Sequence, residues 1–320
     1  MDVNLELLKE FESTINTIEP EKGEIPIKIL GYGEISLVFE ILDDPLHNAY
    51  KRIPIFDSEK QVKRHIWAFN TYNKLLQDNL GILLPEQKAI WFKDKEGRIQ
   101  FYIIQKKVNS EAVGNQVIHH ISDQEVETLI LLAMRELKKV WVSNKENENL
   151  EIGIDGQISN FVVLDYDFNN PKINENNKLL YLDTSTPMFR KNGAEGMEAE
   201  LFLKSTPSFL RFLIKAFFLQ EVLDRYYDWR LVTIDLIANF FKEQKPEIIP
   251  RLIGRVNRFF REEAADFSIK PITLDEIQKY YKSDKTIWLV FQNARRIDRF
   301  IKTKLLRKNY EYYLPGKIER

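Results

Sequence analysis

The spacing of hydrophobic residues divides the chain into a part that favours strands and a part that favours helices. Between residues 25 and 104, short apolar runs alternate with glycine-containing or charged turns, which is typical of β-hairpins. From Pro207 onward, apolar residues recur at helical spacing almost without interruption. The pattern therefore predicts an α+β protein in which an antiparallel sheet comes first and a larger, mainly helical part follows.

Two helices are expected to accompany the sheet. A leading helix over residues 3–18 would be ended by Pro20 and Gly23, and a second over residues 58–78 would end before Gly81. Their expected core faces are Leu7, Phe11, Ile15 and Ile18 in the first, and Val62, Ile66, Phe69, Tyr72 and Leu76 in the second.

The helical part is expected to contain one long helix and several shorter ones. Ser122 and Glu125 have the spacing of a capping box, so a long helix should begin there. Its expected core face is Val126, Leu129, Ile130, Ala133, Leu137 and Val140 or Trp141. Further helices are predicted at residues 231–243, 247–263, 273–282 and 286–308.

Composition excludes several classes of protein. The chain has 320 residues, 44% of them hydrophobic, which is enough for one bilobal unit or two modest domains. Lys plus Arg number 47 and Asp plus Glu 48, so no nucleic-acid partner is expected. The absence of Cys excludes disulfide scaffolds and thiol catalysis. No run approaches the ~18 apolar residues of a membrane span, and no signal peptide is recognisable, so a cytoplasmic protein without a transmembrane segment is expected.

The first candidate for chemistry is a glycine turn between two strands. Gly31, Gly33 and Ser36 separate the apolar runs 27–30 and 37–42. Glycine lets backbone N–H groups approach an anion closely, because it has no Cβ. A dinucleotide fingerprint would need a helix after the turn, and the residues after Ser36 favour a strand. An ordinary hairpin turn fits the same residues.

The second candidate is a set of polar side chains at the ends of apolar runs. Asp155 and Asn160 precede the apolar run 161–164, and Asp183 directly follows the apolar run 180–182. Polar groups at strand ends can converge on a cleft, although Asp-Gly and Asn are also common turn residues and a plain hairpin loop is the alternative. Lys51 lies on a predicted third strand, where a solvated side chain is the usual outcome.

Taken in order, these segments resemble the protein-kinase-like superfamily. The pattern G-x-G-x-x-S-x-V ends at Val38, A-x-K ends at Lys51, and D-x-x-x-x-N runs from Asp155 to Asn160. The resemblance covers residues 25–190 and is nearest the aminoglycoside phosphotransferase and choline-kinase-like branch, within which an uncharacterised bacterial family is expected. It implies a bilobal fold, with residues 1–107 as the nucleotide-binding lobe and residues 108–320 as a helical lobe carrying the catalytic loop.

The resemblance also implies roles for individual residues, with ATP and Mg²⁺ as cofactors. Asp155 would be the catalytic-loop acid at the acceptor hydroxyl, and Asn160 and Asp183 would be magnesium ligands. The residues implied at the nucleotide phosphates are Gly31, Gly33, Ser36 and Lys51. The first hypothesis is therefore a phosphotransferase acting on a small molecule, since no A-P-E motif of the peptide-binding region follows Asp183.

Departures from the family pattern keep other hypotheses open. Gly153 stands where the catalytic-loop His would be, and Asp183-Thr184-Ser185 replaces D-F-G. The middle of the 58–78 helix offers His65, Asn70 and Asn73 but no Glu to pair with Lys51, and Glu59 lies near its start. A pseudokinase that acts through a protein partner is the alternative, and nucleotidyl or other group transfer is a third.

Three further segments have competing interpretations. Residues 226–230 are candidates for lining the acceptor site or for a helix junction. The basic face of the 286–308 helix is suited to anionic lipid or phosphate, or to plain solvent. The acidic stretch 165–170 could mimic a calcium loop but lacks the Gly and terminal Glu of an EF-hand, so a solvated loop is expected.

Overall fold

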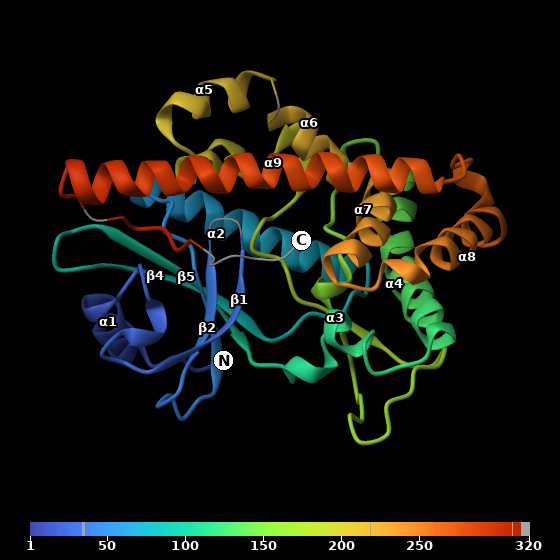
Figure 1. Cartoon of the computed structure of the whole chain (residues 1–320), viewed down its shortest axis with the longest axis horizontal. Helices are drawn as coiled ribbons and strands as arrows, with labels where there is room; N and C mark the ends of the chain where they lie inside the picture. Colours follow the sequence, from blue (N-terminus) through green and yellow to red (C-terminus); the bar gives the residue numbers. More distant parts are fainter. Residues whose placement is uncertain (34–35, 218, 309, 315–320) are drawn as a thin grey trace.

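The structure combines an antiparallel sheet with a larger set of helices (Figure 1). It is a computed structural model that describes residues 1–33, 36–217, 219–308 and 310–314. The predicted α+β class, with strands first and helices after them, is confirmed. None of the described helices is long and apolar enough to cross a membrane.

The main sheet has five antiparallel strands in the order β1-β2-β3-β5-β4. Side chains on a strand alternate between faces, and two separate cores form on the two sides. Phe39 and Tyr50 contribute to one core, while Phe101 and Ile103 contribute to the other. The strands are β1 Ile27–Tyr32, β2 Leu37–Ile41, β3 Asn48–Arg52, β4 Gln87–Lys93 and β5 Ile99–Lys106.

Helix α1, Leu5–Thr14, covers one face of the sheet but is shorter than the predicted 3–18 helix. Its buried residues are Leu8, Phe11 and Glu12, whereas Ile18 is 60% exposed. Leu7 and Ile15 are partly buried against the same core as Phe11, so the predicted core face is confirmed except for Ile18. The prediction missed Glu12, which the helix turns inward to pair with a buried arginine of β3. Periodicity of apolar residues cannot reveal such a charged core position.

Helix α2, Glu59–Lys74, lies on the other face of the sheet and continues into the π-turn Leu75–Asn79. Its side chains Val62 and Phe69 join the core formed by Phe101 and Ile103. Tyr72 and Leu76 instead join the core of the helical part. Helix α2 therefore links the sheet to the helices, and its predicted extent is confirmed.

The helical part is built around α4, Asp123–Glu146, which begins with the predicted Ser122/Glu125 capping box. All of its predicted core residues are buried. The other α-helices are α3 Gly114–Val117, α5 Ser208–Phe217, α6 Leu219–Asp224, α7 Trp229–Lys242, α8 Ile249–Glu262 and α9 Leu274–Phe300. The 3₁₀ turns are Pro20–Lys22, Ser110–Ala112, Ile158–Asn160, Ala199–Ser205, Arg225–Tyr227, Pro246–Ile248 and Ala265–Phe267.

Helix α9 is continuous where two helices, 273–282 and 286–308, were expected. The intervening Ser283-Asp284-Lys285 contains neither Gly nor Pro, so nothing in the backbone chemistry ends the helix there. It runs along the long axis of the molecule and continues into the π-turn Ile301–Leu305 (Figure 1).

After α9 the chain returns to the sheet. Tyr310 and Tyr313 are buried, and the backbone oxygen of Glu311 accepts a hydrogen bond from Arg52 Nη1 at 2.8 Å. The carboxylate of Glu311 also contacts Arg98 at 2.8 Å. The segment 310–314 thus lies against the N-terminal sheet although it is far from it in sequence.

Two small sheets lie between the main sheet and the helices. One consists of β6 Leu150–Ile152, β9 Phe189–Lys191 and β10 Ala194–Glu195. The other is the antiparallel pair β7 Phe161–Val163 and β8 Leu179–Tyr181, whose connecting loop contains the acidic stretch 165–170. The strand ends of these sheets carry the polar clusters that the sequence singled out.

Candidate functional site

The β7–β8 pair brings two of the predicted metal ligands to the same strand end. Phe161 is opposite Tyr181, so the residue before β7 and the residues after β8 are neighbours. The backbone N–H of Leu182 donates to the carbonyl of Asn160 at 2.8 Å. Asn160 and Asp183 are therefore adjacent in space although 23 positions separate them in sequence.

Lys51 on β3 contacts Asp183 directly. Its Nζ lies 2.9 Å from Asp183 Oδ1. The hydroxyl of Ser185 donates to the same carboxylate oxygen at 2.7 Å and also contacts Lys51. Burial raises the pKa of Asp183, but the charge of Lys51 and the hydrogen bonds from Ser185 outweigh it, so that pKa lies below its usual value. The predicted lysine and the predicted metal-binding acid thus form one ion pair.

The loop before Asp155 is held by three backbone contacts. The carbonyl of Gly153 accepts from the hydroxyl of Tyr72 at 2.8 Å, and its N–H donates to Met188 at 2.9 Å. Ile154 N–H donates to the carbonyl of Tyr226 at 3.1 Å. A Cβ at Gly153 would lie only 3.0 Å from that same carbonyl oxygen. A side chain at position 153 would therefore require the Tyr226–Tyr227 segment to shift by a few tenths of an ångström.

Asp155 itself faces a second acid that sequence reasoning missed. Gln157 links the two, since its backbone N–H donates to Asp155 Oδ1 and its side-chain amide donates to Asp235 Oδ2, each at 3.1 Å. Burial and then the negative charge of Asp235 raise the pKa of Asp155 to about 7, and Asp183 adds to this shift. Burial likewise raises the pKa of Asp235. The available signal was an acid set among the apolar residues 232–240 of α7.

The amide of Asn160 also supports the Asp155 loop. Its Nδ2 donates to the backbone carbonyl of Asp155 at 3.3 Å, which leaves Oδ1 as the free acceptor of that side chain among the described residues. One region thus contains Asp155, Asn160 and Asp183, and Lys51 reaches it from β3 through its contact with Asp183. No group of three or more His, Asp or Glu side chains gathers as a metal site in the part of the chain that the structure describes.

Helix α2 presents His65, not a glutamate, toward this region. His65 is 2% exposed, and neither ring nitrogen has a hydrogen-bond partner among the described residues. Burial lowers its pKa to about 4, an effect that the nearby backbone of Ser185 partly opposes. Glu59, at the start of the helix, instead pairs with Lys93 at 2.9 Å. Among the described residues no carboxylate of α2 pairs with Lys51, whose acidic partner is Asp183.

The glycine turn forms the β1–β2 connection. Gly33 N–H donates to the carbonyl of Ser36 at 3.0 Å, and a Cβ on Gly33 would lie 2.4 Å from Ser36 Oγ. Gly31 is opposite Val38 just after a bulge in β1, and a Cβ there would meet nothing within 4 Å. Glu34 and Ile35, the tip of the predicted phosphate loop, lie outside the described residues. The close contact at Gly33 is with a side-chain oxygen that can rotate away, so in the described part of the turn neither glycine is required by steric exclusion.

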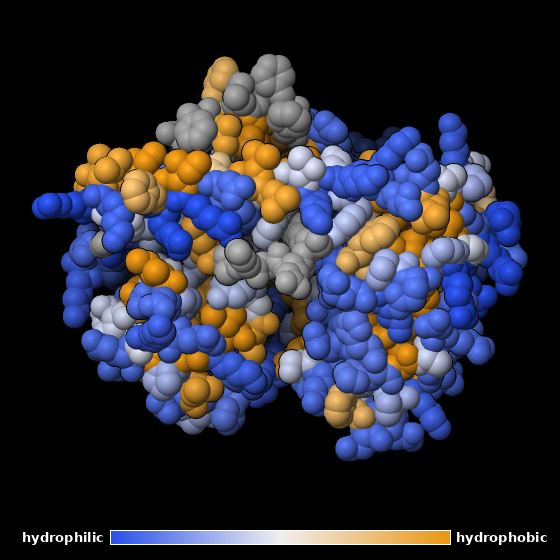
Figure 2. All heavy atoms as spheres, viewed as in Figure 1, coloured by the Kyte–Doolittle hydropathy of each residue, from blue (hydrophilic) through white to orange (hydrophobic). Residues whose placement is uncertain are grey.

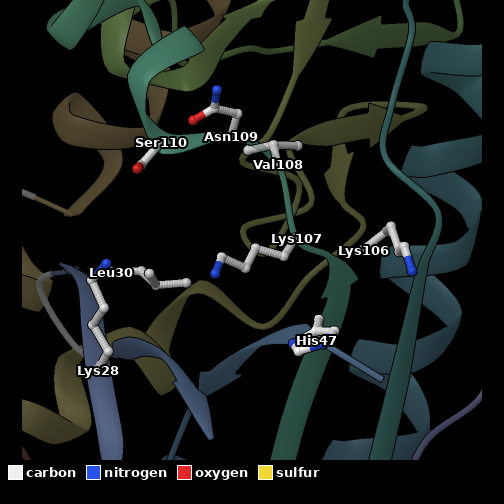
Figure 3. Close-up of a pocket in the computed structure, with 8 residues that line it drawn as sticks. All are labelled: Lys28, Leu30, His47, Lys106, Lys107, Val108, Asn109 and Ser110. Atoms are coloured by element: carbon white, nitrogen blue, oxygen red, sulfur yellow. The ribbon is translucent and has the colours of Figure 1, made fainter. Parts of the chain in front are cut away.

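A cavity of about 360 Å³ lies where the sheet meets the chain segment after β5 (Figure 3). Figure 3 shows Lys107 extending into it toward Leu30 of β1, with Ser110 and Lys28 on its rim. Lys28 on β1 is opposite Glu40 on β2, and Val38 on β2 is opposite Lys51 on β3. Glu40 and Val38 are two residues apart on β2 and therefore lie on the same face of the sheet. The cavity and Lys51 are thus on the same side of the sheet.

The distance between the cavity and Lys51 follows from the register of the paired strands β3 and β5. Asn48 pairs with Lys106 at the cavity, and Lys51 pairs with Ile103. Three residues along a strand span roughly 10 Å. An elongated ligand with an anionic end could therefore reach from the cavity to Lys51.

Residues 226–230 form mainly a helix junction. Tyr227 donates to Glu195 at 2.9 Å, and Trp229 stacks on Trp141 with 5.4 Å between ring centroids. Arg230 pairs with Glu276 at 2.7 Å. Tyr226 lines a small cleft beside the Asp155 loop, together with Gly156, Arg225, Leu231, Val232, Asp235 and Tyr280.

Comparison with known proteins identifies a family. The model of a family of unknown function, DUF6206, matches residues 10–299. The chain belongs to this family. No curated protein matches the sequence of this DUF6206 member.

Solved structures give distant likenesses to the DUF6206 chain. WaaP in complex with acyl carrier protein is 12% identical, with a TM-score of 0.32, covering 82% of this chain and 96% of that one. The GDP complex of wild-type aminoglycoside 2'-phosphotransferase-IIIa is 12% identical, with a TM-score of 0.32, covering 86% of this chain and 98% of that one. Similarity at this level does not by itself establish a shared activity.

Proposed function

We propose that this protein is an ATP- and Mg²⁺-dependent phosphotransferase that acts on a hydroxyl group of a small molecule. The observation that carries the proposal is the contact between Lys51 and Asp183, at the strand end shared with Asn160 and close to Asp155. Phosphoryl transfer mainly requires groups that position the phosphates and offset their charge. In this proposal residues 1–107 form the nucleotide-binding lobe and residues 108–320 the lobe that carries Asp155.

The available oxygens suit Mg²⁺. Asp183 uses Oδ1 for Lys51 and Ser185, while its Oδ2 and Asn160 Oδ1 accept no hydrogen bond from the described residues. Carboxylate and amide oxygens are ligands that this cation accepts, usually together with waters and substrate phosphates. Asn160 and Asp183 would hold the ion, which when bound supplies positive charge to the transferring phosphate groups.

Asp155 is assigned to the acceptor hydroxyl. Its pKa of about 7 suits a general base that works near neutral pH. As the acceptor oxygen bonds to the γ-phosphorus, its proton passes to Asp155. The bond between that phosphorus and the β–γ bridging oxygen breaks, and ADP leaves. Lys51 offsets the phosphate charge throughout this step.

The nucleotide is assigned to the face of the sheet that carries Lys51. The cavity beside Leu30 and residues 106–110 would receive the base and sugar, and the roughly 10 Å from there to Lys51 would be spanned by the rest of the nucleotide. The glycine turn with Gly31, Gly33 and Ser36 would cover the phosphates.

One observation favours a pseudokinase instead. Among the described residues, helix α2 offers Lys51 no carboxylate. Lys51 therefore has Asp183 as its acidic partner, and the same residue is needed for the metal. A protein that binds nucleotide in this arrangement without turning it over would act through contacts with a partner protein.

Thermal melting with ATP distinguishes these functions. ATP with Mg²⁺ at 100 times its dissociation constant should stabilise the fold by about 2.7 kcal/mol. Release of inorganic phosphate, with water as acceptor, then tests turnover. Stabilisation with phosphate release supports the phosphotransferase, and stabilisation alone supports the pseudokinase. A folded protein whose melting temperature does not respond to millimolar ATP and Mg²⁺ would contradict both.

A further inference from the structure

Exposed hydrophobic side chains gather at the C-terminal end of α9. Eight of the seventeen large hydrophobic residues that are exposed in the described part of the chain lie between residues 287 and 306. They are Ile287, Leu289, Val290, Ile297, Phe300, Ile301, Leu305 and Leu306, here called the α9 patch. Their exposed fractions range from 38% for Ile301 to 67% for Leu305. Single exposed apolar residues need no explanation, but such a concentration marks an interaction surface.

The helix is anchored to the protein by its opposite side. Gln292 and Arg295 are buried, and Arg295 Nη2 donates to the backbone carbonyl of Tyr313 at 3.0 Å. Ile287, Val290, Ile297 and Ile301 are spaced by three, seven and four residues, which places them on one face of a helix. This face is directed away from the anchored side. The patch is therefore presented outward by a fixed helix.

Positive charge accompanies the patch. Lys304, Arg307 and Lys308 are exposed, and within the described residues none of the three makes an ion pair. The one acid between residues 286 and 308 is Asp298, which is already paired with Lys302 at 2.7 Å. The chain as a whole has a net charge of −1, so this end of α9 is a local exception.

The patch lies on the outside of the molecule. Helix α9 spans the molecule below α5 and α6 in the view of Figure 1, and its C-terminal end reaches the left margin, as the β4–β5 hairpin does. Figure 2 shows hydrophobic surface gathered over this end of α9 beside hydrophilic side chains, at the upper left of the view. A surface at the margin of the molecule can meet an extended flat surface.

We propose that the α9 patch binds an anionic lipid surface. A helix that combines exposed Phe, Leu and Ile with unpaired Lys and Arg is suited to lie in the interface of such a membrane. Apolar side chains enter the headgroup region, and the cations face the lipid phosphates. The surface of a protein partner would have to supply both a hydrophobic groove and acidic groups, whereas an anionic bilayer presents both properties everywhere. The proposal is independent of phosphotransferase activity.

Vesicle co-sedimentation of the whole protein tests the proposal. Vesicles of phosphatidylcholine mixed with phosphatidylglycerol should bind the protein, and vesicles of phosphatidylcholine alone should bind it far less. Each cation removed should weaken binding about fivefold, so the combined change Lys304→Glu, Arg307→Glu and Lys308→Glu should abolish it. Phe300→Ser and Leu305→Ser should each weaken it about tenfold. Added salt should also release the protein.

Matched variants elsewhere serve as controls. Leu42→Ser removes a leucine that is 53% exposed in the turn after β2, and Lys95→Glu reverses an exposed lysine in the β4–β5 turn. Both should bind vesicles as the unchanged protein does. Absence of binding to either vesicle type, or equal loss in controls and patch variants, would overturn the proposal. A dimer of the unchanged protein in size-exclusion chromatography that becomes monomeric in Leu305→Ser would also overturn the proposal. A second copy of the chain would then occupy the patch.

Discussion

Arg52 and Glu12 form a buried ion pair on the reverse side of the strand that carries Lys51. Arg52 Nη2 lies 2.6 Å from Glu12 Oε1, and the two side chains are 0% and 3% exposed. Because neighbouring residues of a strand point to opposite faces, Arg52 points to α1 while Lys51 points to the candidate site. The position of Lys51 therefore depends on a charged core that joins α1 to β3.

The Glu12 carboxylate should be essential for stability. Glu12→Gln leaves the buried guanidinium without its main counter-charge, and breaking a buried pair in this way costs about 3 to 5 kcal/mol. Urea denaturation should show that loss in the free energy of unfolding. Glu6→Gln is the matched control, because Glu6 pairs with Lys9 on the surface and should matter by less than about 0.5 kcal/mol. Equal effects of the two changes would contradict the assignment.

Nucleotide binding should depend differently on Lys51 and Asp183. Lys51→Ala should reduce the thermal stabilisation by ATP both with and without Mg²⁺, since the lysine contacts phosphates directly. Asp183→Ala should remove mainly the Mg²⁺-dependent part. For a chain of this size each 1 kcal/mol lost corresponds to roughly 2 to 4 °C in melting temperature. Lys88→Ala, an exposed lysine on β4 of the same sheet, should leave the response unchanged. A similar loss from all three variants would refute this site.

Turnover should require Asp155. Asp155→Ala should lower the rate of phosphate release by about 10²- to 10⁴-fold, the usual contribution of a positioned general base. ATP binding, measured by thermal melting, should be nearly unchanged because the residue is assigned to the acceptor and not to the metal. A variant that retains the original rate would show that another group removes the proton.

The shifted pKa of Asp155 also predicts a pH effect that needs no substrate. Burial and Asp235 raise that pKa from 3.8 to about 7, so the folded state holds its proton more tightly than the unfolded state. Stability should therefore fall as pH rises from about 4 to 7. Asp155→Asn cannot lose a proton and should be more stable than the unchanged protein at pH 8, with a smaller difference at pH 5. Asp43→Asn, on the exposed turn after β2, controls for a general charge effect.

His65 should limit stability in acid. Its pKa is lowered to about 4 by burial, so the folded protein keeps the ring neutral while the unfolded chain takes up a proton near pH 6.5. Stability due to this group is present above pH 6.5 and is lost as pH falls toward 4. His65→Phe should weaken that acid dependence, since Phe suits a site lined by Phe56 and Phe101. His119→Gln changes an exposed histidine and should not. If His65→Phe loses stability in acid as steeply as the unchanged protein does, other groups cause that loss.

The sequence was a reliable guide where burial of apolar residues decides the structure. Helix α4 begins at the predicted capping box and buries the predicted face, because local capping and periodicity agree there. In helix α1 the prediction found the core contacts of Leu7, Phe11 and Ile15 but missed Glu12, because the burial of Glu12 depends on Arg52 forty residues later. Hydrophobic periodicity carries no information about such distant charges.

The candidate site was predictable only in part for the same reason. The order of motifs suggested that Lys51 and Asp183 meet, although 132 positions separate them. Asp235 belongs to the site because α7 packs beside the Asp155 loop, and Gln157 reaches both acids. Such a contact depends on how helices pack in three dimensions, and no spacing along the chain encodes it.

The return of the chain to its first sheet has a consequence for synthesis on the ribosome. Arg52 is neutralised in part by Glu311, which is made 259 residues later. At roughly 5 to 20 residues per second, about 10 to 50 seconds pass between the two. Newly made β3 must wait through that interval with its buried charge only partly matched, so the part of the protein that emerges first should be among the last to reach full stability.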